Sequence, residues 1–201
     1  MTGQPIGIIG AGAWGTALAS VMAQNHDSVL LWALEPEVVD AVNSGRGNPL
    51  YLPNLDLPAH IRATGDISEM AGCSALLLVT PAQHLRSTLQ SLPQTDAPLL
   101  LCAKGIEAGT QLLVSEIVAE LRPSNPLAVL SGPTFAHEVA AGKPTAITLA
   151  CENEATKQLA MMQANAGGVG SGITKESIEC LGGKNPQYGI TFLLSDLKPG
   201  C

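Results

Sequence analysis

Apolar and polar residues follow two distinct patterns along the first 150 residues. Runs of four or five apolar residues have the length of a buried strand, whereas apolar residues spaced three or four positions apart indicate a helix. Because these strand and helix patterns alternate, we expect an α/β fold, a Rossmann-like doubly wound parallel sheet with helices on both faces. The expected strands are residues 6–9, 29–32, 75–79, 99–102, 127–130 and 146–150, and the expected helices are 14–25, 112–121 and one that opens at 35–36 and stops at 44–45.

Glycine-rich or polar segments follow several of the expected strands. They are residues 10–15, Thr80 with Pro81, Lys104, and residues 131–134. In open α/β sheets, ligands collect at the carboxyl ends of the strands. We therefore expect these segments to face one crevice.

The first of these segments has the pattern Gly10-x-Gly12-x-x-Gly15, directly after a strand and at the start of a helix. Gly10 permits the tight turn, Gly12 leaves no side chain between backbone and pyrophosphate, and Gly15 lets helix and strand approach closely. The amides at the helix N-terminus stabilise the anion without a lysine. The segment predicts a site for NAD or NADP, and it disfavours the alternative of a glycine turn with no ligand.

The end of the second expected strand usually selects between NAD and NADP. An acidic residue there binds the ribose hydroxyls, whereas an arginine accommodates the extra phosphate. Here Glu35 follows Trp32-Ala-Leu34. Glu35 favours NAD if it faces the ribose, but it is equally compatible with the first turn of the next helix. The choice of cofactor stays open at this level.

Composition narrows the class of protein. Apolar residues make up 46% of the chain and charged residues 13%, which predicts a packed core, and a net charge of -7 disfavours nucleic acid as a partner. No apolar stretch is long enough to span a bilayer, and no secretion signal is evident, so we expect a cytoplasmic protein. The odd number and wide spacing of the cysteines predict reduced thiols and no metal site; they are Cys73, Cys102, Cys151, Cys180 and Cys201.

Four stretches together resemble the bacterial NAD(P)-dependent glycerol-3-phosphate dehydrogenases, in order and in spacing. They are Gly10-Ala-Gly-Ala-Trp-Gly-Thr-Ala-Leu18, Asn48-Pro-Leu-Tyr-Leu-Pro53, Ala103-Lys-Gly-Ile-Glu107, and Leu130-Ser-Gly-Pro-Thr-Phe-Ala-His-Glu-Val-Ala140 continuing to Ala146. The resemblance covers about the first 155 residues. It implies hydride transfer between a nicotinamide cofactor and the dihydroxyacetone phosphate/glycerol 3-phosphate pair, which supplies glycerophospholipid synthesis.

The resemblance also implies roles for individual residues. Ala13, Trp14 and Ala136 would contact the cofactor, Lys104 would contact both cofactor and substrate, and Gly132 and Thr134 would hold the substrate. Tyr51 either covers part of the cofactor or packs in its own loop. Together with the motif glycines, the candidate cofactor contacts are Gly10, Gly12, Ala13, Trp14, Gly15, Tyr51, Pro81, Lys104 and Ala136.

The chain departs from the family pattern after about residue 155. We expect a nucleotide-binding domain at 1–155 and, at 156–201, a linker with a short tail that resembles the family's C-terminal end, including short helices at 175–180 and near 189–197. The family pattern implies a helical substrate domain with a catalytic lysine, and we find no match for that lysine. Gly182-Gly-Lys-Asn185 is only superficially similar, because Pro186 would interrupt the helix that the motif needs.

These departures predict weak catalysis by this chain alone. Because oriented catalytic groups supply several kcal/mol, we expect activity lower by about a thousandfold or more. An apolar face without its usual domain predicts self-association or poor solubility. The leading hypothesis is an internally truncated dehydrogenase, and the alternatives are an inactive NAD(P)-binding module or another nucleotide-using Rossmann protein. Whether a deletion or a frameshift underlies the departure stays open.

Overall fold

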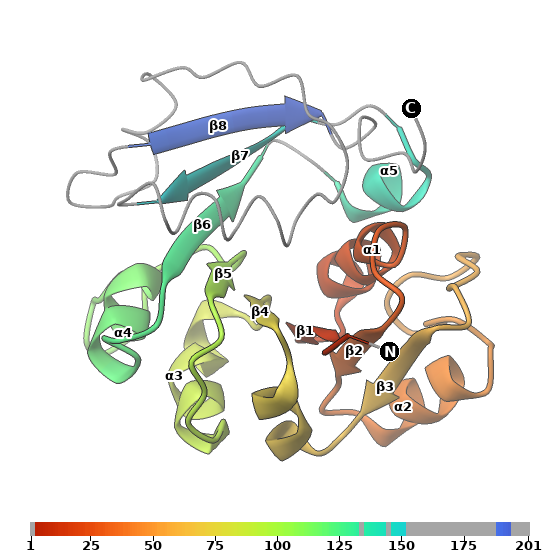
Figure 1. Ribbon diagram of the computed structural model, residues 1–201, viewed down its shortest axis with the longest axis horizontal. Coiled ribbons are helices and arrows are strands. Elements are labelled where there is room, and N and C mark those ends of the chain that lie inside the picture. The colour runs from red at the N-terminus through yellow and green to blue at the C-terminus, as the bar shows by residue number, and fades with distance from the viewer. Residues whose placement is uncertain (1–2, 133–134, 144–145, 152–187, 194–201) are drawn as a thin grey trace.

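A computed structural model describes residues 3–132, 135–143, 146–151 and 188–193. Within these residues one sheet has the strand order β3-β2-β1-β4-β5-β6-β7-β8 (Figure 1). The first six strands in this order pair in parallel, and β7 and β8 are antiparallel to their neighbours. The strands are β1 Ile6–Ile9, β2 Val29–Trp32, β3 Ile61–Thr64, β4 Ala75–Leu78, β5 Leu99–Leu101, β6 Leu127–Ser131, β7 Ala146–Cys151 and β8 Tyr188–Leu193.

Helices cover both faces of the parallel part of the sheet. On one face α1 packs beside α5 and shares a core with α2, and on the other face α3 and α4 lie together with the short 3₁₀ helix η1 (Figure 1). The helices are α1 Ala13–Met22, α2 Pro36–Asn43, η1 Ile67–Gly72, α3 Ala82–Ser91, α4 Val114–Leu121 and α5 Ala136–Ala140.

The central strands are apolar throughout because both of their faces are buried. In β4, Leu77 belongs to the core beneath α1, whereas Leu76 and Leu78 belong to the core beneath α3 and α4. Successive side chains of a strand point to opposite faces, so one short apolar run contributes to both cores. This double burial fixes the carboxyl end of each strand relative to its neighbours.

The predicted Rossmann-like doubly wound fold is confirmed, and the strand order 3-2-1-4-5-6 of its parallel part is the one typical of dinucleotide-binding sheets. The expected strand at 146–150 is present as β7, but it pairs antiparallel with β6 and so extends the parallel sheet with an antiparallel edge. The helix predicted near residues 189–197 is wrong. Residues 188–193 form β8, whose backbone completes its hydrogen bonds with β7 and therefore does not coil.

Four elements of the described chain were not predicted: β3, η1, α3 and α5. The predicted linker at 164–172 and the predicted helix at 175–180 lie outside the described residues, as does the domain boundary near residue 155. Across the described part of the chain, every helix is too short or too polar to cross a membrane.

Candidate functional site

Two cavities adjoin along the carboxyl ends of the parallel strands. The glycine-loop cavity, of about 600 Å³, is lined by the loop at Gly10–Gly12, the end of β2 and part of α3. The Lys104 cavity, of about 360 Å³, is lined by Trp14, the loop after β5 and the end of β6. Both cavities share Thr80 and Pro81 after β4 as lining residues, so they lie next to each other at the switch point of the sheet, and we refer to the pair as the crevice.

Backbone geometry explains the three motif glycines. Gly10 has φ +116°, a conformation that side chains rarely adopt, and a Cβ on Gly15 would lie 1.8 Å from the carbonyl oxygen of Gly10. A Cβ on Gly12, by contrast, would meet no atom within 4 Å. Gly10 and Gly15 are thus required by the fold itself, whereas Gly12 keeps open the space beside the helix N-terminus.

The N-terminus of α1 is open to an anion. Gly12 is the N-cap residue, no side chain caps the helix, and the first turn contains no acidic residue. The amides of Ala13, Trp14 and Gly15 belong to the first turn, where a helix provides no carbonyl partner for its own N–H groups. These amides and the helix dipole favour a bound phosphate.

Buried Asn48 ties the glycine loop to a second loop. Its Nδ2 donates to the carbonyl of Ala11 at 2.8 Å and to the hydroxyl of Thr16 at 2.7 Å. Its Oδ1 accepts a hydrogen bond from the backbone amide of Tyr51 at 3.3 Å. One side chain therefore fixes Tyr51 relative to the glycine loop.

Tyr51 and Glu35 face each other across the glycine-loop cavity. The Tyr51 hydroxyl donates a 2.6 Å hydrogen bond to Oε1 of Glu35. This bond to the carboxylate is the main cause of a raised pKa for Tyr51. Glu35 is the N-cap residue of α2, yet its side chain makes no capping hydrogen bond to that helix. The carboxylate is thus directed to the cavity side and not to the helix amides.

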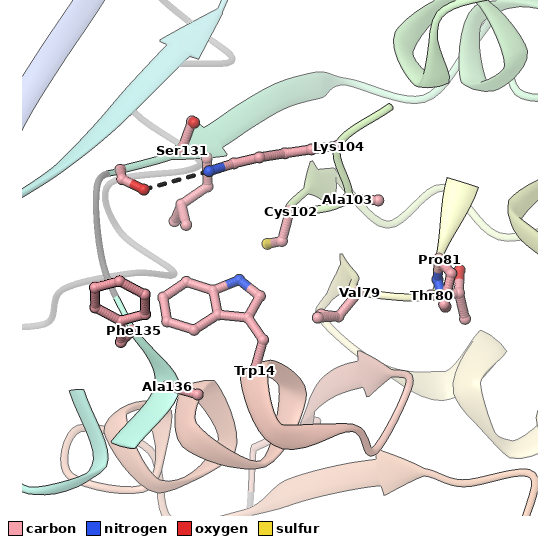
Figure 2. A pocket seen from close by; sticks show the side chains of 12 residues that line it. Trp14, Val79, Thr80, Pro81, Cys102, Ala103, Lys104, Ser131, Phe135 and Ala136 are labelled. Atoms are coloured by element: carbon pink, nitrogen blue, oxygen red, sulfur yellow. Dashed lines mark hydrogen bonds between the residues drawn. The ribbon is translucent and has the colours of Figure 1, made fainter. Parts of the chain in front are cut away.

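Lys104 extends across the second cavity toward the end of β6 (Figure 2). Its Nζ donates a hydrogen bond to the carbonyl oxygen of Gly132 at 3.3 Å. Trp14 and Ala136, from α1 and α5, line the same cavity. The arrangement places one exposed ammonium group in a largely apolar recess, where a phosphate or a polarised carbonyl would find a single strong donor.

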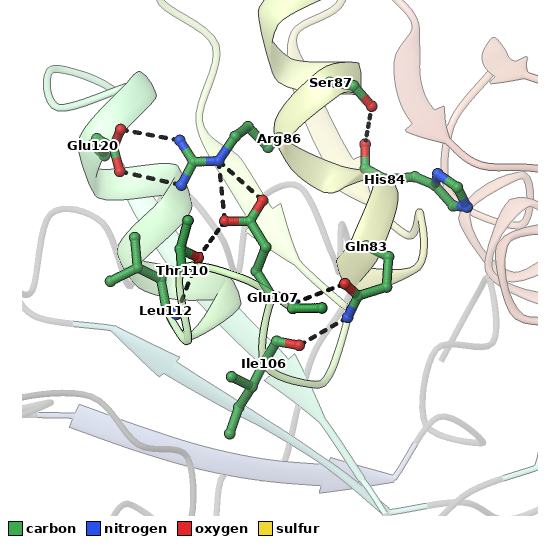
Figure 3. A network of polar contacts seen from close by, with 10 residues as sticks. Gln83, His84, Arg86, Ser87, Ile106, Glu107, Thr110, Leu112 and Glu120 are labelled. Atoms are coloured by element: carbon green, nitrogen blue, oxygen red, sulfur yellow. Dashed lines mark hydrogen bonds and ion pairs between the residues drawn. The ribbon is translucent and has the colours of Figure 1, made fainter.

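A polar network holds the loop that carries Lys104 (Figure 3). Arg86 of α3 bonds both carboxylate oxygens of Glu107 through Nε, at 2.9 and 3.1 Å, and it also pairs with Glu120 of α4. The Thr110 hydroxyl also donates to Glu107. The hydrogen bonds from Arg86 and from Thr110 lower the pKa of the Glu107 carboxyl. The loop after β5 is thereby fastened to two helices.

Thr80 is the clearest sign of an expected ligand. It is only 5% exposed, and its hydroxyl has no hydrogen-bond partner among the described residues. A buried polar group without a partner is costly, and such groups often mark a site that a ligand completes. Thr80 lines both cavities, so this residue lies where a ligand that extends from one to the other would pass.

Other reactive side chains contribute little to the crevice. Burial raises the pKa of the Cys102 thiol to about 12, so this cysteine stays protonated beside the Lys104 cavity.

Within the described ranges, no group of three or more histidine, cysteine, aspartate and glutamate side chains is arranged to hold a metal ion. His137 is exposed and stacks on Phe135 with ring centroids 5.8 Å apart, whereas His84 lines the glycine-loop cavity.

The structure brings most of the predicted site residues to this crevice. Thr134 lies outside the described residues, Ala13 and Gly15 line neither of the two cavities, and Gly15 packs against the carbonyl of Gly10. Sequence reasoning missed the roles of Asn48 and Glu107, although both stand within stretches that carried the family resemblance, and it did not single out His84. The predicted residues that line one of the two cavities are Gly10, Gly12, Trp14, Tyr51, Pro81, Lys104, Gly132 and Ala136.

Comparison with known proteins identifies the family. Residues 5–157 match the family model for the N-terminus of NAD-dependent glycerol-3-phosphate dehydrogenase. The chain is 55% identical over 152 residues to glycerol-3-phosphate dehydrogenase [NAD(P)+] of Parvibaculum lavamentivorans, with 74% of this chain and 46% of that protein covered. The corresponding protein of Erythrobacter litoralis is 51% identical over 148 residues, with 74% and 45% covered.

Solved structures agree with this result. The crystal structure of glycerol-3-phosphate dehydrogenase from Coxiella burnetii has a TM-score of 0.73 and 34% sequence identity, and the match covers 82% of this chain and 52% of that one. The chain spans about half the length of the relatives it matches. From the family model and the identities together, the chain belongs to the NAD-dependent glycerol-3-phosphate dehydrogenase family, whose N-terminal part it matches.

Proposed function

We propose that this chain binds NAD(H) or NADP(H) along the crevice, with the pyrophosphate at the N-terminus of α1. The single observation that carries the proposal is that the two cavities adjoin, with Thr80 and Pro81 lining both. One end holds the open glycine loop, and the other holds Lys104. A dinucleotide bound across the switch point would satisfy both the uncapped helix and the buried Thr80 hydroxyl.

We further propose that the Lys104 cavity receives dihydroxyacetone phosphate or glycerol 3-phosphate, the substrate pair of the family. The ammonium group would bind the substrate phosphate or polarise its carbonyl oxygen. Gly132, whose carbonyl already accepts from Lys104, and Thr134 would complete the substrate contacts. The local positive charge suits an anionic triose although the whole chain carries a net charge of -7.

When bound, the reduced nicotinamide supplies a hydride to the carbonyl carbon of the substrate. The developing alkoxide then needs a proton, and the product is glycerol 3-phosphate. Among the described residues that line the Lys104 cavity, Lys104 is the one positively charged group, and Cys102 keeps its proton because of its raised pKa. Lys104 would have to serve both charge stabilisation and proton transfer, which supports slow turnover by this chain alone.

A cofactor-binding module without turnover is the second candidate. The observation in its favour is that the Lys104 ammonium group is held by a backbone carbonyl, with no second charged side chain beside it in the described lining of the cavity. Such a module would bind the dinucleotide with ordinary affinity because the glycine loop does not depend on Lys104.

The test is NADH and NADPH oxidation by the purified chain, followed by absorbance with and without dihydroxyacetone phosphate. Slow oxidation that depends on the triose phosphate and disappears in Lys104→Ala supports the dehydrogenase. Saturable cofactor binding with no triose-dependent oxidation supports the binding module. If neither reduced cofactor binds, both candidates are wrong.

Two broader features are also proposed. Self-association is supported by large exposed apolar side chains beside the crevice, Phe135 at 66% and Ile106 at 56% exposure, and light scattering of the chain and of its Phe135→Ser variant tests it. A cytoplasmic role in supplying glycerol 3-phosphate for phospholipid synthesis follows from the family, and cell fractionation tests the location.

A further inference from the structure

We infer that the cofactor site prefers NADH to NADPH, and that the Glu35–Tyr51 pair sets this preference. The inference rests on the proposed cofactor site and goes beyond it, since the names of the two relatives, NAD(P)+, leave the choice between the two cofactors open. The observation that carries it is a carboxylate held by a hydroxyl in the loop between β2 and α2, where it lines the cavity of the glycine loop.

The position of Glu35 resolves the alternatives that the sequence left open. Glu35 does not lie in the first turn of α2 but immediately before it, with extended backbone at φ -84° and ψ 118°. Its side chain leaves the helix amides without a cap and lines the cavity together with Gly10 and Gly12. In a dinucleotide-binding sheet, an acidic residue at this point of β2 hydrogen-bonds the adenosine ribose.

Tyr51 holds the carboxylate in place. The hydroxyl donates to Oε1 at 2.6 Å, and an ionised carboxylate has further lone pairs on both oxygens for a ribose diol. Tyr51 is in turn anchored through its backbone amide to buried Asn48, which also bonds the glycine loop at Ala11. The hydrogen bonds made by Asn48 and Tyr51 therefore fix the position of Glu35 relative to the glycine loop.

The described surroundings of Glu35 lack the fixed positive charge that usually holds a 2′-phosphate. The described lining of the glycine-loop cavity contains no lysine or arginine, and its one histidine, His84, comes from α3. Arg62 on the adjacent strand β3 does not line the cavity and is paired with Glu69. Leu34, the residue before Glu35, is 76% exposed and apolar.

Charge then decides between the two cofactors. A 2′-phosphate would bring a dianion against the Glu35 carboxylate with no lysine or arginine in the described lining to compensate, and close like charges strongly disfavour a partner. A ribose diol instead donates hydrogen bonds to that carboxylate. Repulsion of the wrong ligand is as effective a source of specificity as attraction of the right one.

The experiment measures dissociation constants of NADH and NADPH by nicotinamide fluorescence, without substrate, for the wild type, Glu35→Gln and Glu37→Gln. Glu37 is the matched control because it is an exposed carboxylate of the same helix that does not line the cavity. We expect the wild type and Glu37→Gln to bind NADH about tenfold or more tightly than NADPH, and Glu35→Gln to lower that ratio by about tenfold. Leu34→Arg should raise NADPH affinity further, in the Glu35→Gln background.

The outcomes are distinct. Equal or tighter binding of NADPH by the wild type overturns this inference and leaves the proposed cofactor site intact. An unchanged ratio in Glu35→Gln, with circular dichroism showing a folded variant, assigns the preference elsewhere and overturns the role of Glu35. Failure of the wild type to bind either cofactor overturns the proposed function and this inference together.

Discussion

The side-chain amide of Asn48 donates a 2.8 Å hydrogen bond to the carbonyl of Ala11, in the centre of the glycine loop. Asn48 is 1% exposed, so the bond is shielded from water. It joins two loops 37 residues apart in the chain. The shape of the predicted pyrophosphate site therefore depends on a residue that does not itself line the glycine-loop cavity.

Asn48→Ala is expected to lower the free energy of unfolding by about 1–3 kcal/mol, because the carbonyl of Ala11 and the hydroxyl of Thr16 lose a buried donor. It should also weaken NADH binding, since the glycine loop loses its anchor. Asn43→Ala is the control, because Asn43 bonds both backbone groups of Ala63 in β3, far from the glycine loop. Urea unfolding and fluorescence titration give the two quantities, and equal losses of NADH affinity in both variants would contradict the anchoring role.

Gly12→Ala is expected to lose affinity for NADH, whereas Gly15→Ala is expected to lose stability. A Cβ at Gly12 meets nothing within 4 Å and the backbone there has φ -64°, so the variant should fold with nearly unchanged Tm. Its NADH affinity should fall by about tenfold or more because the methyl group occupies the phosphate position. Gly15→Ala should be strongly destabilised, since its Cβ would overlap the Gly10 carbonyl oxygen. If Gly12→Ala binds NADH like the wild type, the anion does not sit at this N-terminus.

Thr80→Val should leave stability unchanged or raise it, because the buried hydroxyl that it removes has no described partner. NADH should bind about three- to tenfold more weakly, the value of one neutral hydrogen bond. Thr80→Ser keeps the hydroxyl and should retain most of the affinity. Thermal melts with and without NADH measure both effects, and a Thr80→Val variant with wild-type affinity would show that the hydroxyl faces no ligand.

The loop that carries Lys104 should loosen at acid pH. In the folded chain, hydrogen bonds from Arg86 and Thr110 lower the pKa of Glu107 below its usual 4.5, whereas in the unfolded chain the ordinary value returns. The stabilisation is therefore present above about pH 4.5 and is lost as the pH falls through the lowered pKa. Glu107→Gln should lower the Tm at pH 7 by several degrees and flatten its decline toward pH 3. A decline as steep as in the wild type would show that the Arg86 pair contributes nothing.

The sequence predicted most of the parallel sheet because its strands are buried on both faces and therefore read as unbroken apolar runs. The edge strand β3 did not stand out, since Arg62 interrupts its four residues. Helix α3 was missed for a similar reason: it is polar except at buried positions such as Leu85 and Leu89.

The antiparallel strands and the supporting residues depend on contacts that no local pattern encodes. Nothing within residues 188–193 specifies the pairing of β8 with β7, which is about 40 residues distant. Likewise, Asn48 contacts the glycine loop, and Arg86 contacts Glu107 21 residues away. The glycine motif and Lys104, by contrast, could be predicted because each follows an apolar strand closely in the sequence.

The most direct test of the account is a titration of the purified chain with NADH, followed by nicotinamide fluorescence and repeated with Gly12→Ala. If the cofactor binds at the N-terminus of α1, the wild type should give a saturable signal that NAD⁺ displaces, and a folded Gly12→Ala variant should give a much weaker one. A wild-type signal that rises linearly without saturation, or one that Gly12→Ala reproduces in full, would contradict cofactor binding at the N-terminus of α1.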